Sequence, residues 1–140
     1  MKATALYRIA SVLLVMIVAA NTVWLMYFSH VTASMSPVRF PFGHRPVSYS
    51  QVVLGFNVFC SLCVLFAAFL AWHLGSLART APRAIGALGW LLLAYLVAGT
   101  FVSLIYFSGF AFLLSAAIAL CTARATSLAA RPQAAPSPAK

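Results

Sequence analysis

The chain has 140 residues, of which 64% are hydrophobic and only 6% are charged, and its mean hydropathy is +1.03. About a quarter of the residues in a soluble domain are charged, so this composition excludes an ordinary water-facing surface and makes a bilayer the solvent for most of the chain. Nine Lys and Arg residues stand against no Asp or Glu, which excludes catalysis and Mg²⁺ or Ca²⁺ binding by acidic side chains.

Four apolar runs are predicted to cross a membrane, for which a helix needs about 20 residues, and the fourth run is the shortest. They cover residues 6–29, 51–75, 82–107 and 110–125. We predict an all-α fold, a four-transmembrane-helix bundle over residues 1–127, multi-pass in the inner membrane of a bacterial cell. The Pro/Ala-rich segment 128–140 is predicted to be a disordered tail.

The first run follows Lys2 and Arg8 and permits two interpretations. Residues 18–20 (Val-Ala-Ala) resemble the cleavage site of a signal peptide. The apolar core of a signal peptide is only about 7–15 residues long, however, and this run continues to Phe28. An uncleaved membrane helix is therefore favoured.

The loop between the first two runs contains three prolines and cannot be one regular helix. Its basic residues, Arg39, His44 and Arg45, permit two hypotheses. They recognise an anionic headgroup or lipid-linked phosphate, or they only anchor the loop at the membrane surface. Anchoring is the commoner role of such residues and is favoured.

The boundaries of the second and third runs carry helix-end signals. Ser48 and Gln51 form the S-x-x-Q pattern of a capping box. Gly75 is predicted to end the second helix, because glycine is common just after a helix C-terminus. Pro82 is predicted at the start of the third, where its missing N–H costs nothing.

Two asparagines lie inside apolar runs at similar depth. Asn21 is about 12 Å from the outer end of the first run, and Asn57 is about 10 Å from the outer end of the second. Adjacent antiparallel helices would bring them together in an interhelical hydrogen bond, which is the favoured interpretation. The alternative is a polar pocket that opens outward.

The second run contains a C-x-x-C pair, Cys60 and Cys63. Reactive pairs of this kind sit at helix N-termini, where the helix dipole stabilises the thiolate, whereas Cys60 lies about nine residues into its run. Packing is therefore favoured over thiol–disulfide chemistry. His73 is about 15 Å from Cys63 along a helix, so no metal site and no cofactor are predicted.

The stretches YRIASVLLV, VLFAAFLAWHLG, APRAIGALGW and LIYFSGF occur in this order within residues 4–123. They resemble an uncharacterised family of small bacterial four-span integral membrane proteins. The resemblance implies membrane location and four helices, and it transfers no catalytic residue.

Three functions are compatible with the sequence. The favoured one is a non-enzymatic accessory or scaffold protein, or a lipid-binding bundle, whose partners are membrane lipids, a second copy of itself or a larger membrane protein. The second is a carrier for a small neutral or anionic solute, and the third is a membrane thiol enzyme. No nucleic acid partner is expected, because the basic residues are single and lie at the ends of apolar runs.

The basic residues also predict an orientation. With the N-terminus inside the cell, one side carries only Arg39 and Arg45. The other side carries Lys2, Arg8, Arg79, Arg83, Arg124, Arg131 and Lys140. Cytoplasmic loops are enriched in Lys and Arg, so both termini are expected in the cytoplasm.

Alkaline phosphatase fused after Lys140 is therefore expected to be inactive, because the enzyme folds only outside the cytoplasm. A phosphatase assay on intact cells measures this, with a fusion in the loop before the second run as the active control. An active fusion after Lys140 would contradict the orientation.

Overall fold

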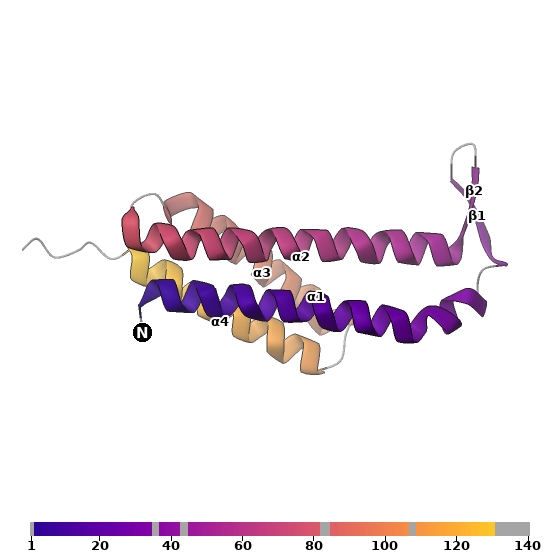
Figure 1. Ribbon diagram of the computed structural model, residues 1–140, viewed down its shortest axis with the longest axis horizontal. Coiled ribbons are helices and arrows are strands. Elements are labelled where there is room, and N and C mark those ends of the chain that lie inside the picture. Colours follow the sequence, from indigo (N-terminus) through magenta and orange to yellow (C-terminus); the bar gives the residue numbers. More distant parts are fainter. Residues whose placement is uncertain (1, 35–36, 43–44, 82–84, 107–108, 131–140) are drawn as a thin grey trace, which may run out of the picture. The chain divides into compact units, whose positions relative to one another are not determined.

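The computed structural model describes residues 2–34, 37–42, 45–81, 85–106 and 109–130. Its helices are α1 (Ala3–Ser34), α2 (Tyr49–Thr80), α3 (Gly86–Tyr106) and α4 (Gly109–Ala130), drawn in Figure 1. All four helices are long and apolar enough to cross a membrane, which confirms the predicted all-α class with four candidate spans. Between α1 and α2 lie two short strands, β1 (Arg39–Phe42) and β2 (Arg45–Ser48).

The first two helices are longer than the predicted spans 6–29 and 51–75. Each has 32 residues, or about 48 Å of helix, against a hydrocarbon thickness of about 30 Å. The prediction that α2 ends at Gly75 is wrong, because Ser-Leu-Ala-Arg-Thr continues the helix without a breaker. Pro82, the predicted start of the third helix, lies outside the described residues, and α3 is described from Gly86.

The C-terminal helix also exceeds its prediction. The fourth span was predicted to end at residue 125, and the tail to begin at residue 128. Helix α4 continues to Ala130, so residues 128–130 are helical. The rest of the predicted tail lies outside the described residues.

The strands form an antiparallel pair that the sequence analysis did not anticipate. Arg39 pairs with Ser48, and Phe42 pairs with Arg45. Three prolines in the loop argued only against a helix, and two of them, Pro41 and Pro46, face each other in this ladder. Proline donates no backbone hydrogen bond, so this pairing is confined to a short ribbon.

The predicted capping box at the start of α2 is confirmed. The backbone N–H of Ser48 donates to Gln51 Oε1 at 3.1 Å, and the backbone N–H of Gln51 donates to Ser48 Oγ at 3.4 Å. The N–H of Tyr49 also donates to the carbonyl of Val38 at 2.9 Å. These bonds join the first turn of α2 to the strand pair, which lies beyond the ends of α1 and α2 in Figure 1.

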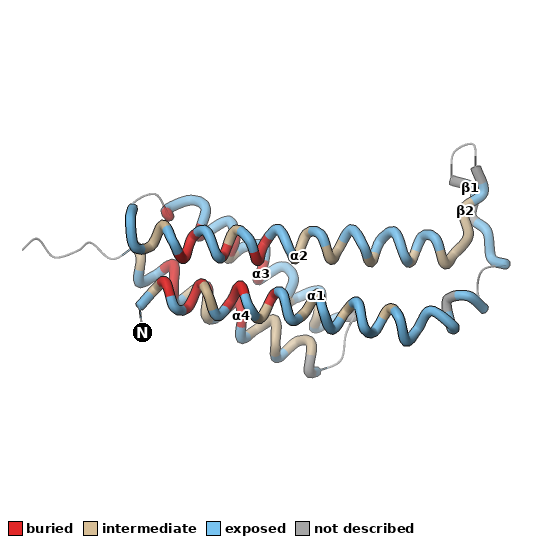
Figure 2. Tube along the Cα trace, in the orientation of Figure 1, coloured by how far each residue is buried: buried red, intermediate tan, exposed pale blue. Residues whose placement is uncertain are grey.

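The chain divides into two compact units. The first unit, Met1–Ser11 with Leu70–Lys140, contains the start of α1, the end of α2, and all of α3 and α4. Most of the buried positions belong to it (Figure 2). Its core side chains are Leu6, Tyr7, Ala10, Ala71, Leu74, Ile85, Leu92, Leu96, Ile118, Ala119 and Ala125, with the polar Thr4, Ser11, Thr122 and Thr126.

A hydrogen bond between two hydroxyl groups crosses this core. The phenol of Tyr7, which is fully buried, lies 2.8 Å from Thr126 Oγ1. The Thr126 hydroxyl donates to the carbonyl of Thr122 at 2.9 Å. Because a threonine hydroxyl has one hydrogen, it accepts from Tyr7. The bond connects α1 to α4 and satisfies a phenol that burial in the protein core would otherwise leave without a partner.

Gly89 of α3 makes room for this contact. A Cβ at this position would lie 3.0 Å from Ile85 Cγ2, 3.0 Å from Tyr7 Oη and 3.1 Å from Thr126 Cγ2. The absence of a side chain thus lets α3 approach α1 and α4 closely, as small residues do in membrane helix packing.

The second unit, Val12–Phe69, contains the rest of α1, the strand pair and most of α2. The two helices run antiparallel within it. Only Leu14, Ala67 and Ala68 are buried among its described side chains. Most of its large apolar side chains are therefore exposed.

Replacing Gly89 by alanine is expected to lower the free energy of unfolding by about 1–3 kcal/mol, because the added methyl group overfills a tight contact. Thermal unfolding in detergent measures the change. Gly99→Ala in the same helix is the control, since a Cβ there meets nothing within 4 Å. Equal stability of the two variants would contradict the close packing at Gly89.

Candidate functional site

The candidate site is a polar cluster between α1 and α2 in the second unit. Asn21 Nδ2 donates to Asn57 Oδ1 at 2.7 Å and to Ser61 Oγ at 3.1 Å. The structure thus contains the hydrogen bond that the depths of the two asparagines predict. The partly buried Ser61 adds a second acceptor.

Helix geometry places these groups. Asn57 and Ser61 are four residues apart on α2, so their side chains lie on the same face, about one turn apart. Asn21 reaches both from the antiparallel α1. The similar depths of Asn21 and Asn57 predict their pairing. Ser61 was not predicted as a partner, although its four-residue spacing from Asn57 was the available signal.

The two hydrogen bonds do not use all the donors and acceptors of the two asparagines. An amide nitrogen has two hydrogens, and the two bonds use both hydrogens of Asn21. The Asn57 amide group and Asn21 Oδ1 retain hydrogen-bonding capacity beyond these two bonds. The cluster therefore stabilises the helix pair and also offers polar groups inside an apolar segment.

The structure keeps the cysteines away from helix ends. Cys60, Cys63 and Cys121 are half-buried free thiols. Cys60 lies about 16 Å along α2 from Tyr49, where the dipole of the helix N-terminus does not act. Among the described residues, no three His, Cys, Asp or Glu side chains gather where they could hold a metal ion.

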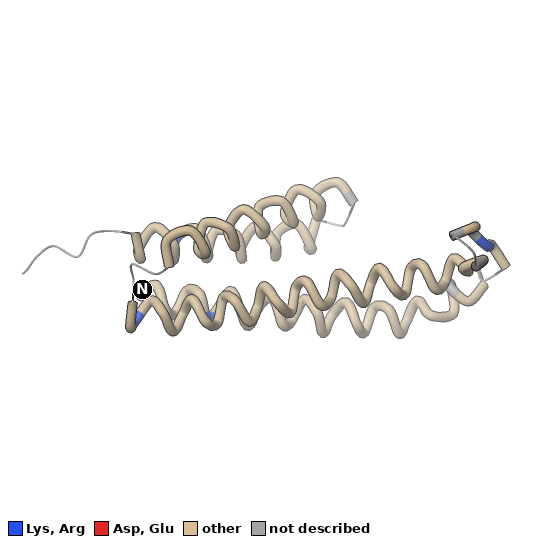
Figure 3. The backbone as a smooth tube through the Cα atoms, turned by 90° about the horizontal axis from the view of Figure 1, so that it is seen from above, with Lys and Arg blue, Asp and Glu red and all other residues tan. Residues whose placement is uncertain are grey.

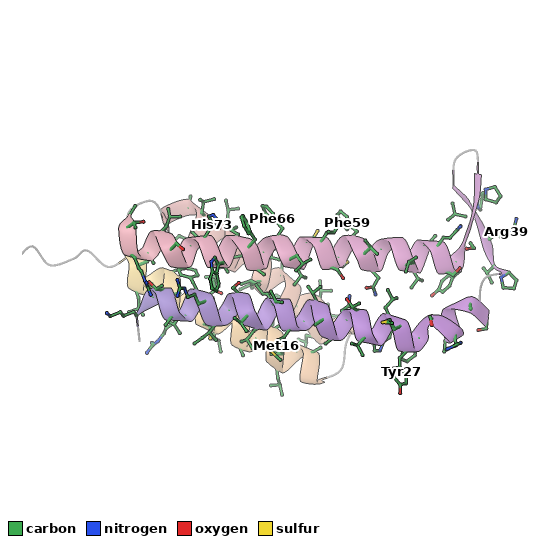
Figure 4. The ribbon with its side chains drawn as sticks, in the orientation of Figure 1. Met16, Tyr27, Arg39, Phe59, Phe66 and His73 are labelled. Atoms are coloured by element: carbon green, nitrogen blue, oxygen red, sulfur yellow. The ribbon has the colours of Figure 1, made fainter. Side chains whose placement is uncertain are left out.

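The basic residues of the loop are only partly described. Arg39 is exposed on β1 and is labelled in Figure 4. Arg45 starts β2, where its backbone pairs with Phe42. His44 and the side chain of Arg45 lie outside the described residues.

One contact of a basic residue escaped the sequence analysis. The Arg8 guanidinium carbon lies 4.9 Å from the centre of the Trp72 ring, in the first unit. The signal for this contact was a single arginine two turns into a helix, in a chain without acidic residues.

Comparison of the chain with protein-family models, curated proteins and solved structures found no match.

Asn57→Leu is expected to lower the free energy of unfolding by about 0.6–2 kcal/mol, because it removes the acceptor of Asn21 at membrane depth. A double-mutant cycle with Asn21→Leu, measured by unfolding in detergent, isolates the pairwise energy. Strictly additive effects of the two substitutions would show that the bond contributes no stability.

Proposed function

We propose that this protein is a non-enzymatic accessory or scaffold protein of the bacterial inner membrane, with both termini in the cytoplasm. Its helices bind membrane lipids and a membrane partner, either a second copy or a larger protein. The resemblance to small bacterial four-span proteins supports the location, and the distribution of basic residues supports the orientation.

The main support for this proposal is the apolar surface that the second unit exposes. Phe56, Phe59, Phe66 and Phe69 of α2 are all more than three-fifths exposed. Phe59 and Phe66 differ by only about 20° around the helix axis, and both are about 160° from Asn57 or more. They point away from α1 in Figure 4.

Helix α1 shows the same division. Met16 and Tyr27 are 60% and 83% exposed and point away from α2 in Figure 4. Each helix of the pair thus turns polar or small groups toward its partner and large apolar groups outward. Such a surface suits acyl chains and the helices of other membrane proteins.

A carrier is the second candidate, supported by Asn21, Asn57 and Ser61. Their unused hydrogen-bonding groups are suited to a small neutral or anionic solute. A membrane thiol enzyme using Cys60 and Cys63 ranks third, because both thiols lie in the middle of α2.

The test is photo-crosslinking in native membranes, with a photoreactive amino acid at Phe59 or at Phe66. A scaffold is expected to give discrete protein adducts of defined mass from these outward positions, identified by mass spectrometry. The matched control is Ala68, on the buried side of the same helix.

The accessory function would be contradicted if Phe59 and Phe66 gave only lipid adducts and the protein migrated as a lone monomer. Uptake of solute by proteoliposomes that is lost in Asn57→Leu would establish the carrier instead.

A further inference from the structure

Arg8 is held half-buried in the first unit without a hydrogen bond to its Nε atom. This nitrogen is buried and has no partner in the structure. The Arg8 guanidinium carbon lies 4.9 Å from the centre of the Trp72 ring, so the cation sits against the indole of α2. Tryptophan is the best ring for a cation–π interaction, and arginine is the cation found most often in such pairs.

No acidic side chain of this chain neutralises Arg8, because the 140 residues contain no Asp or Glu. Figure 3 accordingly shows basic positions and no acidic position on the described backbone. Charged side chains that are buried in proteins are usually paired with an opposite charge. No side chain of this protein can therefore supply an anionic partner for the guanidinium.

The close approach of α1 and α2 fixes where Arg8 lies. A Cβ on Gly75 would be 3.4 Å from the carbonyl oxygen of Thr4, 3.4 Å from Tyr7 Cβ and 3.6 Å from Arg8 Cγ. The aliphatic part of Arg8 therefore lies across Gly75, and its head lies against Trp72, one turn away. This contact restricts the guanidinium before any ligand arrives.

The distribution of charge along α1 and α2 predicts that Arg8 and Trp72 lie where the helices meet the membrane surface. Residues 9–29 follow Arg8 without a charge, and their length of about 31 Å matches the hydrocarbon core. Trp72 likewise ends the apolar residues 52–72, just before His73. Tryptophan and arginine at such boundaries sit among the headgroups, at the depth of the lipid phosphates.

Two further cations belong to the same end of the unit. Because α1 and α2 run antiparallel and Thr4 lies against Gly75, Lys2 is level with the last turn of α2, which carries Arg79. Both side chains are exposed. Their positive potential favours lipids with a net negative charge over zwitterionic ones.

We propose that Arg8, seated on Trp72, binds a phosphate oxygen of an anionic phospholipid at the membrane surface near the N-terminus. This site deepens the lipid-binding part of the proposed function and rests on it. The guanidinium offers a planar set of N–H donors that matches a phosphate group.

Native mass spectrometry of the full chain in mild detergent tests the site, with phosphatidylglycerol and phosphatidylcholine as probes. The wild type is expected to bind phosphatidylglycerol more tightly than phosphatidylcholine. Arg8→Gln is expected to weaken phosphatidylglycerol binding by about tenfold, and Arg8→Lys by less, since lysine keeps the charge but loses the planar donor set.

The matched control is Arg124→Gln, which removes an exposed arginine from α4 in the same unit. It is expected to change binding by less than about twofold. Equal losses in Arg8→Gln and Arg124→Gln would indicate general charge attraction and overturn the site. Equal binding of the two lipids by the wild type would also overturn it.

Two additional measurements keep the test decisive. Inorganic phosphate at millimolar concentration is expected not to displace the lipid; displacement would show a small-anion site and overturn the lipid assignment. If Arg8→Gln does not fold, Trp72→Leu replaces it, and unchanged lipid selectivity in that variant would overturn the site.

Protein adducts at Phe59 report the partner surface separately, so failure of the lipid site is distinguishable from failure of the scaffold function.

Discussion

The rest of the structure depends on one constraint, which is that polar groups inside hydrocarbon need partners within the protein. Water is not available there, and an unpaired group is costly. Most helix hydroxyls meet the constraint locally. Thr100 donates to the carbonyl of Leu96, Ser115 to that of Ala111 and Thr122 to that of Ile118. Other polar side chains join one helix to another, as Tyr7 does with Thr126 and Asn21 with Asn57.

Polar side chains in the two units find partners on another helix in different ways. In the first unit the Tyr7 phenol bonds to Thr126 across a core, and Gly89 allows the close approach. In the second unit Asn21 binds Asn57 and Ser61 between two helices whose other faces stay exposed. A packed core supplies rigidity, whereas an exposed apolar surface supplies contact area. This difference is the physical basis for placing partner contacts on the second unit.

The acid-free composition carries a separate consequence for electrostatics. Without carboxylates the basic side chains have aromatic rings, backbone carbonyls and lipid phosphates as their available partners. Arg8 against Trp72 shows the first kind. The same excess of positive charge underlies the proposed orientation, because basic residues are retained on the cytoplasmic side of a membrane. The positive charge therefore affects the proposed orientation of the chain and its contacts with lipid headgroups.

The sequence by itself determined the class of protein, the four apolar helices, the capping box at Ser48 and Gln51, and the common depth of Asn21 and Asn57. These features depend on composition, local spacing and helix periodicity, which a linear pattern contains.

Tertiary structure decided the partners. Gly75 was predicted as a helix end, but its place is explained by the close approach of Thr4 and Tyr7. The Tyr7–Thr126 bond joins residues 119 positions apart, and the Arg8–Trp72 contact joins separate helices. The sequence of the strand pair gives only a weak strand pattern, because prolines interrupt it. No local signal specifies such contacts, because they depend on which helix faces meet.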